Sequence, residues 1–335
     1  MKKIYVVSSL VALLIIIVAL LSAGKIISWP LTEDKKTEPV KIGVLYTSNS
    51  HKLAFDGLRD KMAEDDYKEG EKVEFIIKQI ADPNAAASAT KELLNAGVKL
   101  IYSIATPVTI AVKKEVDESF PIVFNIVGDP VGPGLVKSFS EPGMNVTGCT
   151  NLSVALSGKR LEIFKQAFPN IKRVVTFYDP ANSLSKLSIE ETRKAASGLG
   201  IEVKEVLVKS VEEIDAELAK LRPGEFDGFY NTPDTRVVGR IDKVVARANE
   251  LKIPVMGHEE DLAVKGVALT YGANFYLLGR DCAVVVENII RGHSPKTEPV
   301  ISPSKLELII NQKTLDAIGK TISQPILSQA DKIIK

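Results

Sequence analysis

Polar side chains recur in this sequence at the ends of predicted strands. In an open parallel sheet, ligands bind beyond the carboxyl ends of the strands. Hydroxyl groups and free backbone N–H groups at helix starts can hold a carboxylate, and acidic side chains can hold an ammonium group. The candidate ligand-binding residues are Ser48, Thr106, Asp129, Asn182, Ser183, Asp234, Glu259 and Tyr271.

Each of these candidates also has a purely structural interpretation. Ser, Thr, Asp and Asn after a strand are the residues that cap the next helix, so capping explains any single one as well as ligand contact does. The set is more persuasive than its members, because one cleft must be lined by these loops. Asp129, Asp234 and Glu259 are the candidates for an ammonium group, and Tyr271 could provide an aromatic wall.

The sequence lacks the motifs of common catalytic, metal and cofactor sites. It has no Gly-x-Ser-x-Gly nucleophile turn, no phosphate-binding loop and no GxGxxG fingerprint. His51, His258 and His293 are isolated and have no metal-ligand spacing. His51 lies in a first-lobe loop and could face the cleft, but solvent exposure is its favoured interpretation. We therefore expect no catalytic residue, no metal and no cofactor.

Strands and helices alternate from Val40 onward, which is typical of parallel sheets with helices on both faces. Helices are expected between the strands, including one over 185–199 that ends at Gly200. The predicted strands are 40–47, 72–80, 99–105, 121–127, 173–179, 201–208, 226–232 and 253–258.

Two segments of the chain match element for element. Lys99–Pro130 and Phe226–Asp261 each hold a buried strand, a Thr-Pro pair, a helix, a second buried strand and an acidic loop. We therefore predict an α/β fold of two doubly wound parallel-sheet lobes joined by a three-segment hinge at 143–151, 268–274 and 298–304. Lobe 1 is predicted to hold residues 40–149 and about 271–299, and lobe 2 residues 150–270 and about 300–335.

The N-terminus carries an export signal. Lys2 and Lys3 precede an uncharged apolar run from Ile4 to Gly24, and a polar spacer ends at Pro39. A cleaved signal peptide and an uncleaved membrane anchor both fit residues 1–39, because the run is also long enough to span a bilayer. Either way, the folded part is expected outside the cytoplasm, in the periplasm or at the cell surface.

Charge and cysteine content exclude two further classes of protein. The formal net charge of +1 over 335 residues lacks the basic footprint of a nucleic-acid binder. Only Cys149 and Cys282 occur, so a disulfide scaffold is excluded. One bridge between these cysteines is compatible with an oxidising compartment, but buried reduced side chains are the favoured interpretation.

Four stretches of the sequence carry a family resemblance, namely Ile122–Gly148, Leu161–Ser185, Tyr271–Pro295 and Leu306–Gly319. They resemble the substrate-binding proteins of ABC transporters, in the subfamily that includes the tryptophan-associated binding proteins. The resemblance implies a type I periplasmic-binding fold, a permease as partner and cleft contacts at Ser48, Thr106, Asp129, Asn182, Ser183, Asp234 and Tyr271.

We therefore expect an extracytoplasmic, monomeric binding protein that captures an amino acid or related small polar molecule and delivers it to an ABC transporter permease. A membrane-anchored sensing module is the first alternative. An exported hydrolase or lyase is the second, and it would use Asp129 with Glu259 or Glu260 as an acid–base pair.

Overall fold

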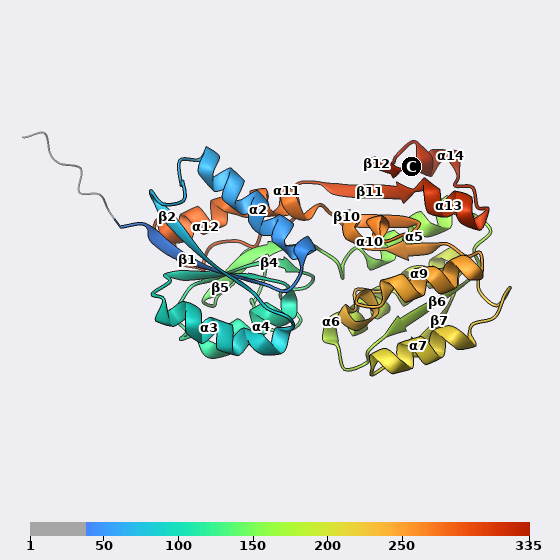
Figure 1. The fold of residues 1–335 in the computed structure, drawn as a ribbon, viewed down its shortest axis with the longest axis horizontal. Coiled ribbons are helices and arrows are strands. Elements are labelled where there is room, and N and C mark those ends of the chain that lie inside the picture. The colour runs from blue at the N-terminus through green and yellow to red at the C-terminus, as the bar shows by residue number, and fades with distance from the viewer. Residues whose placement is uncertain (1–37) are drawn as a thin grey trace, which may run out of the picture. The chain divides into compact units, whose positions relative to one another are not determined.

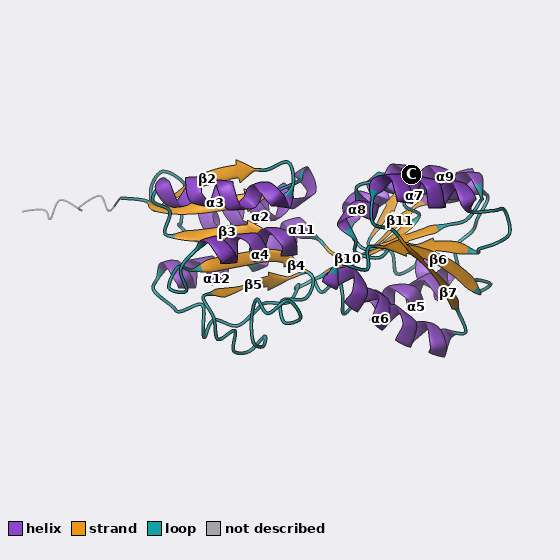
Figure 2. Cartoon of the chain, turned by 90° about the horizontal axis from the view of Figure 1, so that it is seen from below, coloured by secondary structure: helices purple, strands orange, loops and turns teal. Residues whose placement is uncertain are grey.

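Two separate sheets organise residues 38–335, the part of the chain that this computed structural model describes (Figure 1). Helices cover both faces of each sheet (Figure 2), and the predicted α/β fold of two doubly wound lobes is confirmed. Within these residues, no helix combines the length and apolarity needed to cross a membrane. The predicted export segment lies outside the described residues.

The first lobe is built on a five-stranded parallel sheet with the order β2-β1-β3-β4-β5. Its strands are β1 Val40–Tyr46, β2 Val73–Gln79, β3 Leu100–Ile104, β4 Ile122–Val127 and β5 Val146–Thr150. Its helices are α2 Asn49–Glu64, the 3₁₀ turn η1 Pro83–Ala85, α3 Ala86–Asn95, α4 Thr106–Glu115, α11 Phe275–Asp281 and α12 Ala283–Ile290.

The second lobe repeats this topology. Its seven-stranded sheet has the order β7-β6-β8-β9-β10-β11-β12, so its first five strands follow the same 2-1-3-4-5 pattern as the first lobe. Its strands are β6 Arg173–Tyr178, β7 Glu202–Leu207, β8 Gly228–Tyr230, β9 Val255–Gly257, β10 Leu269–Ala273, β11 Leu306–Asn311 and β12 Lys332–Ile334. Its helices are α5 Ser157–Ala167, α6 Ser183–Leu199, α7 Val211–Lys220, α8 Thr235–Val238, α9 Ile241–Glu250, α10 Glu260–Val264, α13 Gln312–Ile318 and α14 Gln324–Leu327.

Burial and capping explain why these segments fold as they do. Every residue of β3 and β4 is buried, as expected for parallel strands covered on both faces. Helix α6 begins after Asn182, whose side chain accepts from two backbone N–H groups, and it ends at Gly200 in the left-handed conformation (φ 63°). The predicted C-cap at Gly200 is therefore confirmed.

The segments predicted as hinge joints are partly strands. The joint at 143–151 contains β5, and the joint at 268–274 contains β10, which pairs with β11 in an antiparallel ladder. Ile301, in the third joint, forms an isolated bridge with Cys149 of β5. The chain thus crosses between the lobes after Thr150, after Ala273 and before Leu306. The predicted lobe boundaries themselves stay a prediction.

A disulfide joins Cys149 and Cys282, which corrects the interpretation of these residues as reduced cysteines. Cys149 lies in β5 and Cys282 lies between α11 and α12, with their Cα atoms 5.8 Å apart and a separation of 133 positions in the sequence. Both side chains are fully buried. The two cysteines meet because the chain returns to the first lobe after Ala273. Their spacing in the sequence does not reveal this return.

Helices α2 and α11 cross so closely that each needs a glycine at the contact. A Cβ atom added at Gly279 would lie 1.9 Å from the carbonyl oxygen of Ala54, and one at Gly57 would lie 2.0 Å from that of Tyr276. We expect Gly279→Ala to lower the free energy of unfolding by about 1–3 kcal/mol, because the helices must separate.

Urea unfolding followed by circular dichroism measures this effect. Gly198→Ala in α6 is the matched control, since a Cβ atom there would meet no described atom within 4 Å apart from its chain neighbours and the backbone of its own helix. The control should be neutral or stabilise by up to about 1 kcal/mol, because alanine favours helix more than glycine does. Equal stability of the two variants would contradict the close helix contact.

Candidate functional site

A cavity of about 410 Å³ lies between the two lobes, lined by residues from both. Thr47 and Ala105 follow β1 and β3, and Pro233 and His258 follow β8 and β9, so both sheets contribute the carboxyl ends of their strands. In the first lobe these residues flank the point between β1 and β3 where the strand order reverses, which is where open α/β sheets bind ligands.

The first-lobe wall offers hydroxyl groups at two helix starts. Ser48 caps α2: its Oγ accepts from the backbone N–H of His51 at 3.2 Å and lies 2.9 Å from Oγ of Ser50. Thr106 opens α4, and its Oγ1 accepts from the N–H of Gly128 at 3.3 Å. Among the described residues no side chain caps α4, so the N–H groups of its first turn are left for another partner.

Two residues of this wall have unusual backbone conformations. Ala105 has φ 91° and Ile126 has φ 54°, and both line the cavity. Ile126 lies at the register shift between β4 and β5, and its N–H bonds to the side chain of the preceding Asn125 at 2.7 Å. Positive φ is costly for a β-branched residue, and such conformations concentrate at functional sites.

The second-lobe wall is acidic. Glu259, Asp261 and Lys265 line the cavity at the start of α10 and just beyond it. Burial, followed by the negative charge of Asp261, raises the pKa of Glu259 to about 7, and Lys265 opposes the shift. Glu259 is thus a carboxyl group that loses its proton near neutral pH.

Both histidines of the cavity are neutral at pH 7. Burial lowers the pKa of His51 to about 4 against the opposing charge of Asp261, and its Nδ1 lies 3.1 Å from Oγ1 of Thr47. Burial and then the charge of Arg160 lower the pKa of His258 to about 3. His51 is half-buried and lines the cavity, so it faces the cleft, which was the less favoured of its two interpretations.

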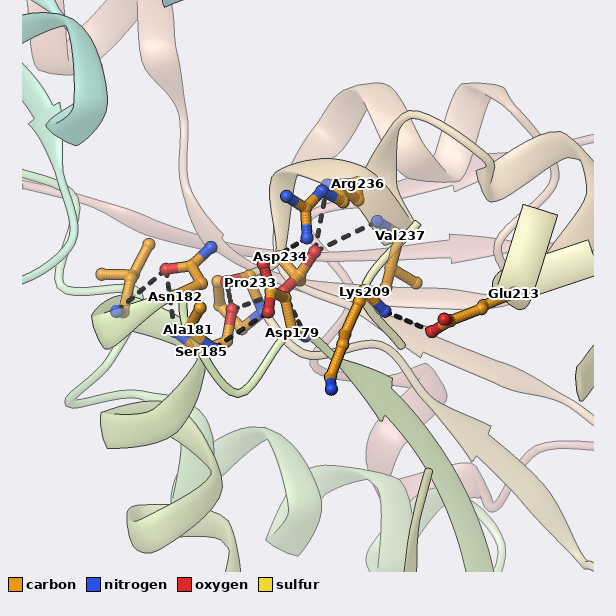
Figure 3. A network of polar contacts seen from close by, with 11 residues as sticks. Asp179, Ala181, Asn182, Ser185, Lys209, Glu213, Pro233, Asp234, Arg236 and Val237 are labelled. Atoms are coloured by element: carbon orange, nitrogen blue, oxygen red, sulfur yellow. Dashed lines mark hydrogen bonds and ion pairs between the residues drawn. The ribbon is translucent and has the colours of Figure 1, made fainter. Parts of the chain in front are cut away.

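Asp234 lines the cavity and also joins three segments of the second lobe (Figure 3). Its Oδ2 accepts from the N–H of Asp179 at 2.9 Å and from Oγ of Ser185 at 2.7 Å. Its Oδ1 caps α8 by accepting from the N–H groups of Arg236 and Val237 at 3.0 and 3.2 Å. Arg236 in turn pairs with the carboxylate of Asp179. The two oxygens of Asp234 therefore accept four hydrogen bonds within the lobe.

Four of the eight predicted site residues line the cavity, and four do not. Ser48, Thr106, Asp234 and Glu259 line it. The others have local structural roles or lie elsewhere, although ligand contact by any of the eight stays a prediction. Asp129 accepts from the N–H groups of Val131 and Gly132 in its own turn, Asn182 caps α6, Ser183 is exposed, and Tyr271 packs against the second-lobe core.

Several cavity residues have no counterpart in the sequence prediction. Asn151 and Ser153 come from the crossing after β5, and the prediction missed them because it did not recognise β5 as a strand. Leu184 is the second residue of α6 and Val238 is the last residue of α8, and a search for polar groups at strand ends passes over such apolar residues. Recognising Val146–Thr150 as a buried strand would have directed attention to Asn151.

Comparison with known proteins places this geometry in a family. The sequence model of a family described as ABC transporter substrate binding protein matches residues 39–334, nearly the whole described chain. The chain belongs to this family. The proteins of this family bind solutes and are not enzymes, so the predicted transport binding protein is confirmed and the hydrolase alternative is discarded.

Individual relatives agree with this assignment. A tyrosine-binding protein from Clostridioides difficile (strain R20291) is 30% identical over 290 residues, which cover 86% of this substrate-binding protein and 82% of that protein. A conserved domain protein from Vibrio cholerae superposes with a TM-score of 0.81 at 26% identity over 88% of this chain and 100% of that chain. An ABC domain in complex with L-Trp from Streptococcus pneumonia gives 0.79 at 26% identity over the same shares.

The fold and location of the substrate-binding protein follow from these matches. Its two lobes have the type I periplasmic-binding-protein-like fold that the sequence predicts. Proteins of this family work outside the cytoplasm in association with ABC transporters. The acid–base pair considered for a hydrolase also lacks a geometric basis, because Glu260 forms an ion pair with Lys332 at 2.6 Å and Asp129 does not line the cavity.

Proposed function

We propose that this substrate-binding protein captures a zwitterionic amino acid between its lobes, and that tyrosine and tryptophan are the first candidates. The observation that carries the proposal is the complementary polarity of two facing stretches of the cavity wall, apart from Asp82 in the first lobe and Lys265 in the second. Hydroxyl groups and helix starts at Ser48 and Thr106 face a wall with the carboxyl groups of Glu259 and Asp261.

This polarity suits the two charged groups of an amino acid. The uncapped start of α4 and the hydroxyl of Thr106 provide donors for a carboxylate. Glu259, once it has lost its proton, provides an acceptor for an ammonium group. Both groups are attached to the same carbon of the ligand, so they bind close together and draw the two walls toward each other.

An apolar side chain of the ligand has its own surroundings in the cavity. Ile126 from the first lobe and Leu184 and Val238 from the second line it, together with the rings of Pro83, Pro107 and Pro233. The relatives are named for tyrosine binding and for a complex with L-Trp, which supports a large, mainly apolar ligand side chain. Pockets of this mixed character are typical of small-molecule sites.

A screen of the twenty amino acids by thermal shift and titration calorimetry tests the proposal on the purified full-length protein. A ligand at 100 times its dissociation constant should stabilise the fold by about 2.7 kcal/mol. We expect L-tyrosine or L-tryptophan to give the largest shift. Failure of every amino acid to shift the melting temperature at millimolar concentration would refute the proposal.

We further propose that the protein acts as a monomer that hands its ligand to an ABC transporter permease, after export by its N-terminal segment. Membership of the family and the apolar run at 4–24 support this route. Cell fractionation distinguishes a released protein from a membrane-held one. Recovery of the folded protein in the cytoplasm of the native cell would contradict export.

Binding should depend on pH through Glu259. Its pKa of about 7 means that the carboxyl group holds a proton at pH 6 and has lost it at pH 8. An ammonium group binds the carboxylate only, so we expect affinity at pH 8 to be about tenfold higher than at pH 6. Calorimetry at both pH values with the amino acid found in the screen measures the ratio.

Two variants isolate this effect. Glu259→Gln should bind more weakly and with little dependence on pH, whereas Glu260→Gln, whose carboxylate pairs with Lys332 outside the cavity, should keep the tenfold ratio. In the ligand-free protein the folding stability changes with pH in the opposite direction to the ligand affinity. The folded pKa lies above the ordinary value of 4.5, so stability falls as the pH rises from about 4.5 to about 7. A pH-independent affinity in the wild type would contradict the role of Glu259.

A further inference from the structure

Arg160 is a buried arginine that has no counter-charge among residues 38–335. It lies on α5 of the second lobe with 1% of its surface exposed. Its Nη2 donates to the backbone carbonyl of Ser153 and, at 3.0 Å, to Oγ of Ser157. Within residues 38–335, its Nε and Nη1 have no hydrogen-bond partner, and no carboxylate lies within 4.0 Å of its guanidinium nitrogens.

Such a group needs an anion. A guanidinium stays charged at every physiological pH, so it cannot relieve its burial by losing a proton as a lysine or histidine does. A buried water molecule could accept its hydrogen bonds but would bring no negative charge. Burial of an isolated charge is strongly unfavourable, so buried charges in proteins are paired.

The position of Arg160 connects it to the cavity. The carbonyl that it holds belongs to Ser153, which lines the cavity, and its charge lowers the pKa of His258, which also lines it. Ser153 packs against the first lobe, since a Cβ atom added at Gly128 would lie 2.2 Å from its Oγ. The N–H of Gly128 donates to Thr106, so a chain of contacts through Ser153 and Gly128 links Arg160 to the start of α4.

We propose that Arg160 is a positioning residue whose buried charge, acting through Ser153, makes a carboxylate an obligatory part of the ligand. This inference rests on the proposed function and deepens it. The ligand's carboxylate, bound at Thr106 and the start of α4, supplies the negative charge that Arg160 lacks. Arg160 therefore sets a requirement for an acid over its uncharged amide, without needing to touch the ligand.

A comparison of L-tyrosine with L-tyrosinamide tests this role, with the tryptophan pair used instead if tryptophan is the better ligand. Calorimetry on the full-length protein should show the wild type binding the acid at least about tenfold more tightly than the amide. Arg160→Gln keeps a hydrogen-bond donor and removes the charge. We expect it to lose affinity for the acid by about tenfold and to bind the amide as the wild type does, so the acid-to-amide ratio collapses.

The controls separate charge from structure. Arg247→Gln removes a second-lobe arginine that also donates to a backbone carbonyl, that of Leu221, and does not line the cavity, so its ratio should stay that of the wild type. Arg160→Lys keeps the positive charge and should keep most of the wild-type ratio of acid affinity to amide affinity. An equal loss of acid and amide binding in Arg160→Gln would show a merely structural role and overturn the proposal.

If Arg160→Gln does not fold, Arg160→Lys tests the charge role, and the wild type alone can still overturn it. A wild type that binds acid and amide equally overturns the charge role and leaves the proposed amino-acid binding intact. A wild type that binds neither compound, nor any other amino acid, overturns the proposed function, and this inference falls with it.

Discussion

Replacement of Asp234 by alanine should lower the free energy of unfolding by about 3–5 kcal/mol, because several buried donors lose their acceptor at once. The carboxylate accepts from the backbone of Asp179, from the hydroxyl of Ser185 and from two N–H groups that begin α8. Its side chain is 1% exposed, so water replaces these bonds poorly. Urea unfolding followed by circular dichroism measures the loss.

The same substitution should weaken ligand binding by at least about tenfold, because pocket residues must be held within a fraction of an ångström to bind well. Leu184 and Val238 line the cavity from the two segments that Asp234 holds together. The two oxygens of Asp234 already accept four hydrogen bonds inside the lobe. Asp234 therefore positions the cavity wall, and it has little acceptor capacity left for an ammonium group. Calorimetry on the folded fraction at low temperature measures this loss separately from stability.

Asp129→Ala is the matched control for Asp234→Ala. Asp129 also accepts from two backbone N–H groups, but its turn lies at the surface of the first lobe, and its partners Val131 and Gly132 are exposed. We expect Asp129→Ala to lower the free energy of unfolding by about 1 kcal/mol or less, as for other surface turns. A similar small cost for both variants would show that the second lobe does not depend on Asp234.

The sequence predicted the parts of the fold that repeat a simple pattern. Apolar runs such as Leu100–Ile104 and Ile122–Val127 are buried on both faces, so composition alone marks them as parallel strands. Strand β5 was missed because Gly148 and two threonines make Val146–Thr150 resemble a flexible joint. Gly148 is required there for a different reason: a Cβ atom at its φ of 150° would lie 2.1 Å from the carbonyl oxygen of Phe124.

The sequence predicted the site less completely than the fold. The rule that ligands bind beyond strand ends identified Ser48, Thr106 and Glu259 in the cavity wall. It could not distinguish a side chain that faces the cavity from one that turns back to cap a helix, as Asn182 does. Whether a side chain faces the cavity or caps a helix depends on the conformation of its loop and on how the two lobes meet. The same limit hid the disulfide, since Cys149 and Cys282 meet only after the chain has built the second lobe and returned.

The second large effect concerns this disulfide. Removing it in the Cys149→Ala/Cys282→Ala variant should lower the free energy of unfolding by about 2–4 kcal/mol. The bridge closes a loop of 133 residues, so it removes much of the conformational freedom of the unfolded chain. Both cysteines lie outside the cavity wall, and ligand affinity should therefore stay unchanged.

Thermal unfolding with and without dithiothreitol measures the contribution of the bridge. The reductant should lower the melting temperature of the wild type and leave that of the double variant unchanged, because the variant has no bridge to lose. Reduction of the wild type should be slow below the transition, since both sulfur atoms are fully buried and are reached only when the first lobe opens.

Loss of the disulfide should destabilise the part of the first lobe where the chain re-enters it after building most of the second lobe. Helices α11 and α12 come from the far side of the hinge, and the bridge fixes their junction to β5 at the edge of the sheet. Hydrogen exchange in the double variant should therefore rise in α11, α12 and β5 more than in the second-lobe sheet. Two free thiols in the denatured protein, isolated from an oxidising compartment without reductant, would contradict the bridge, because such compartments preserve disulfides.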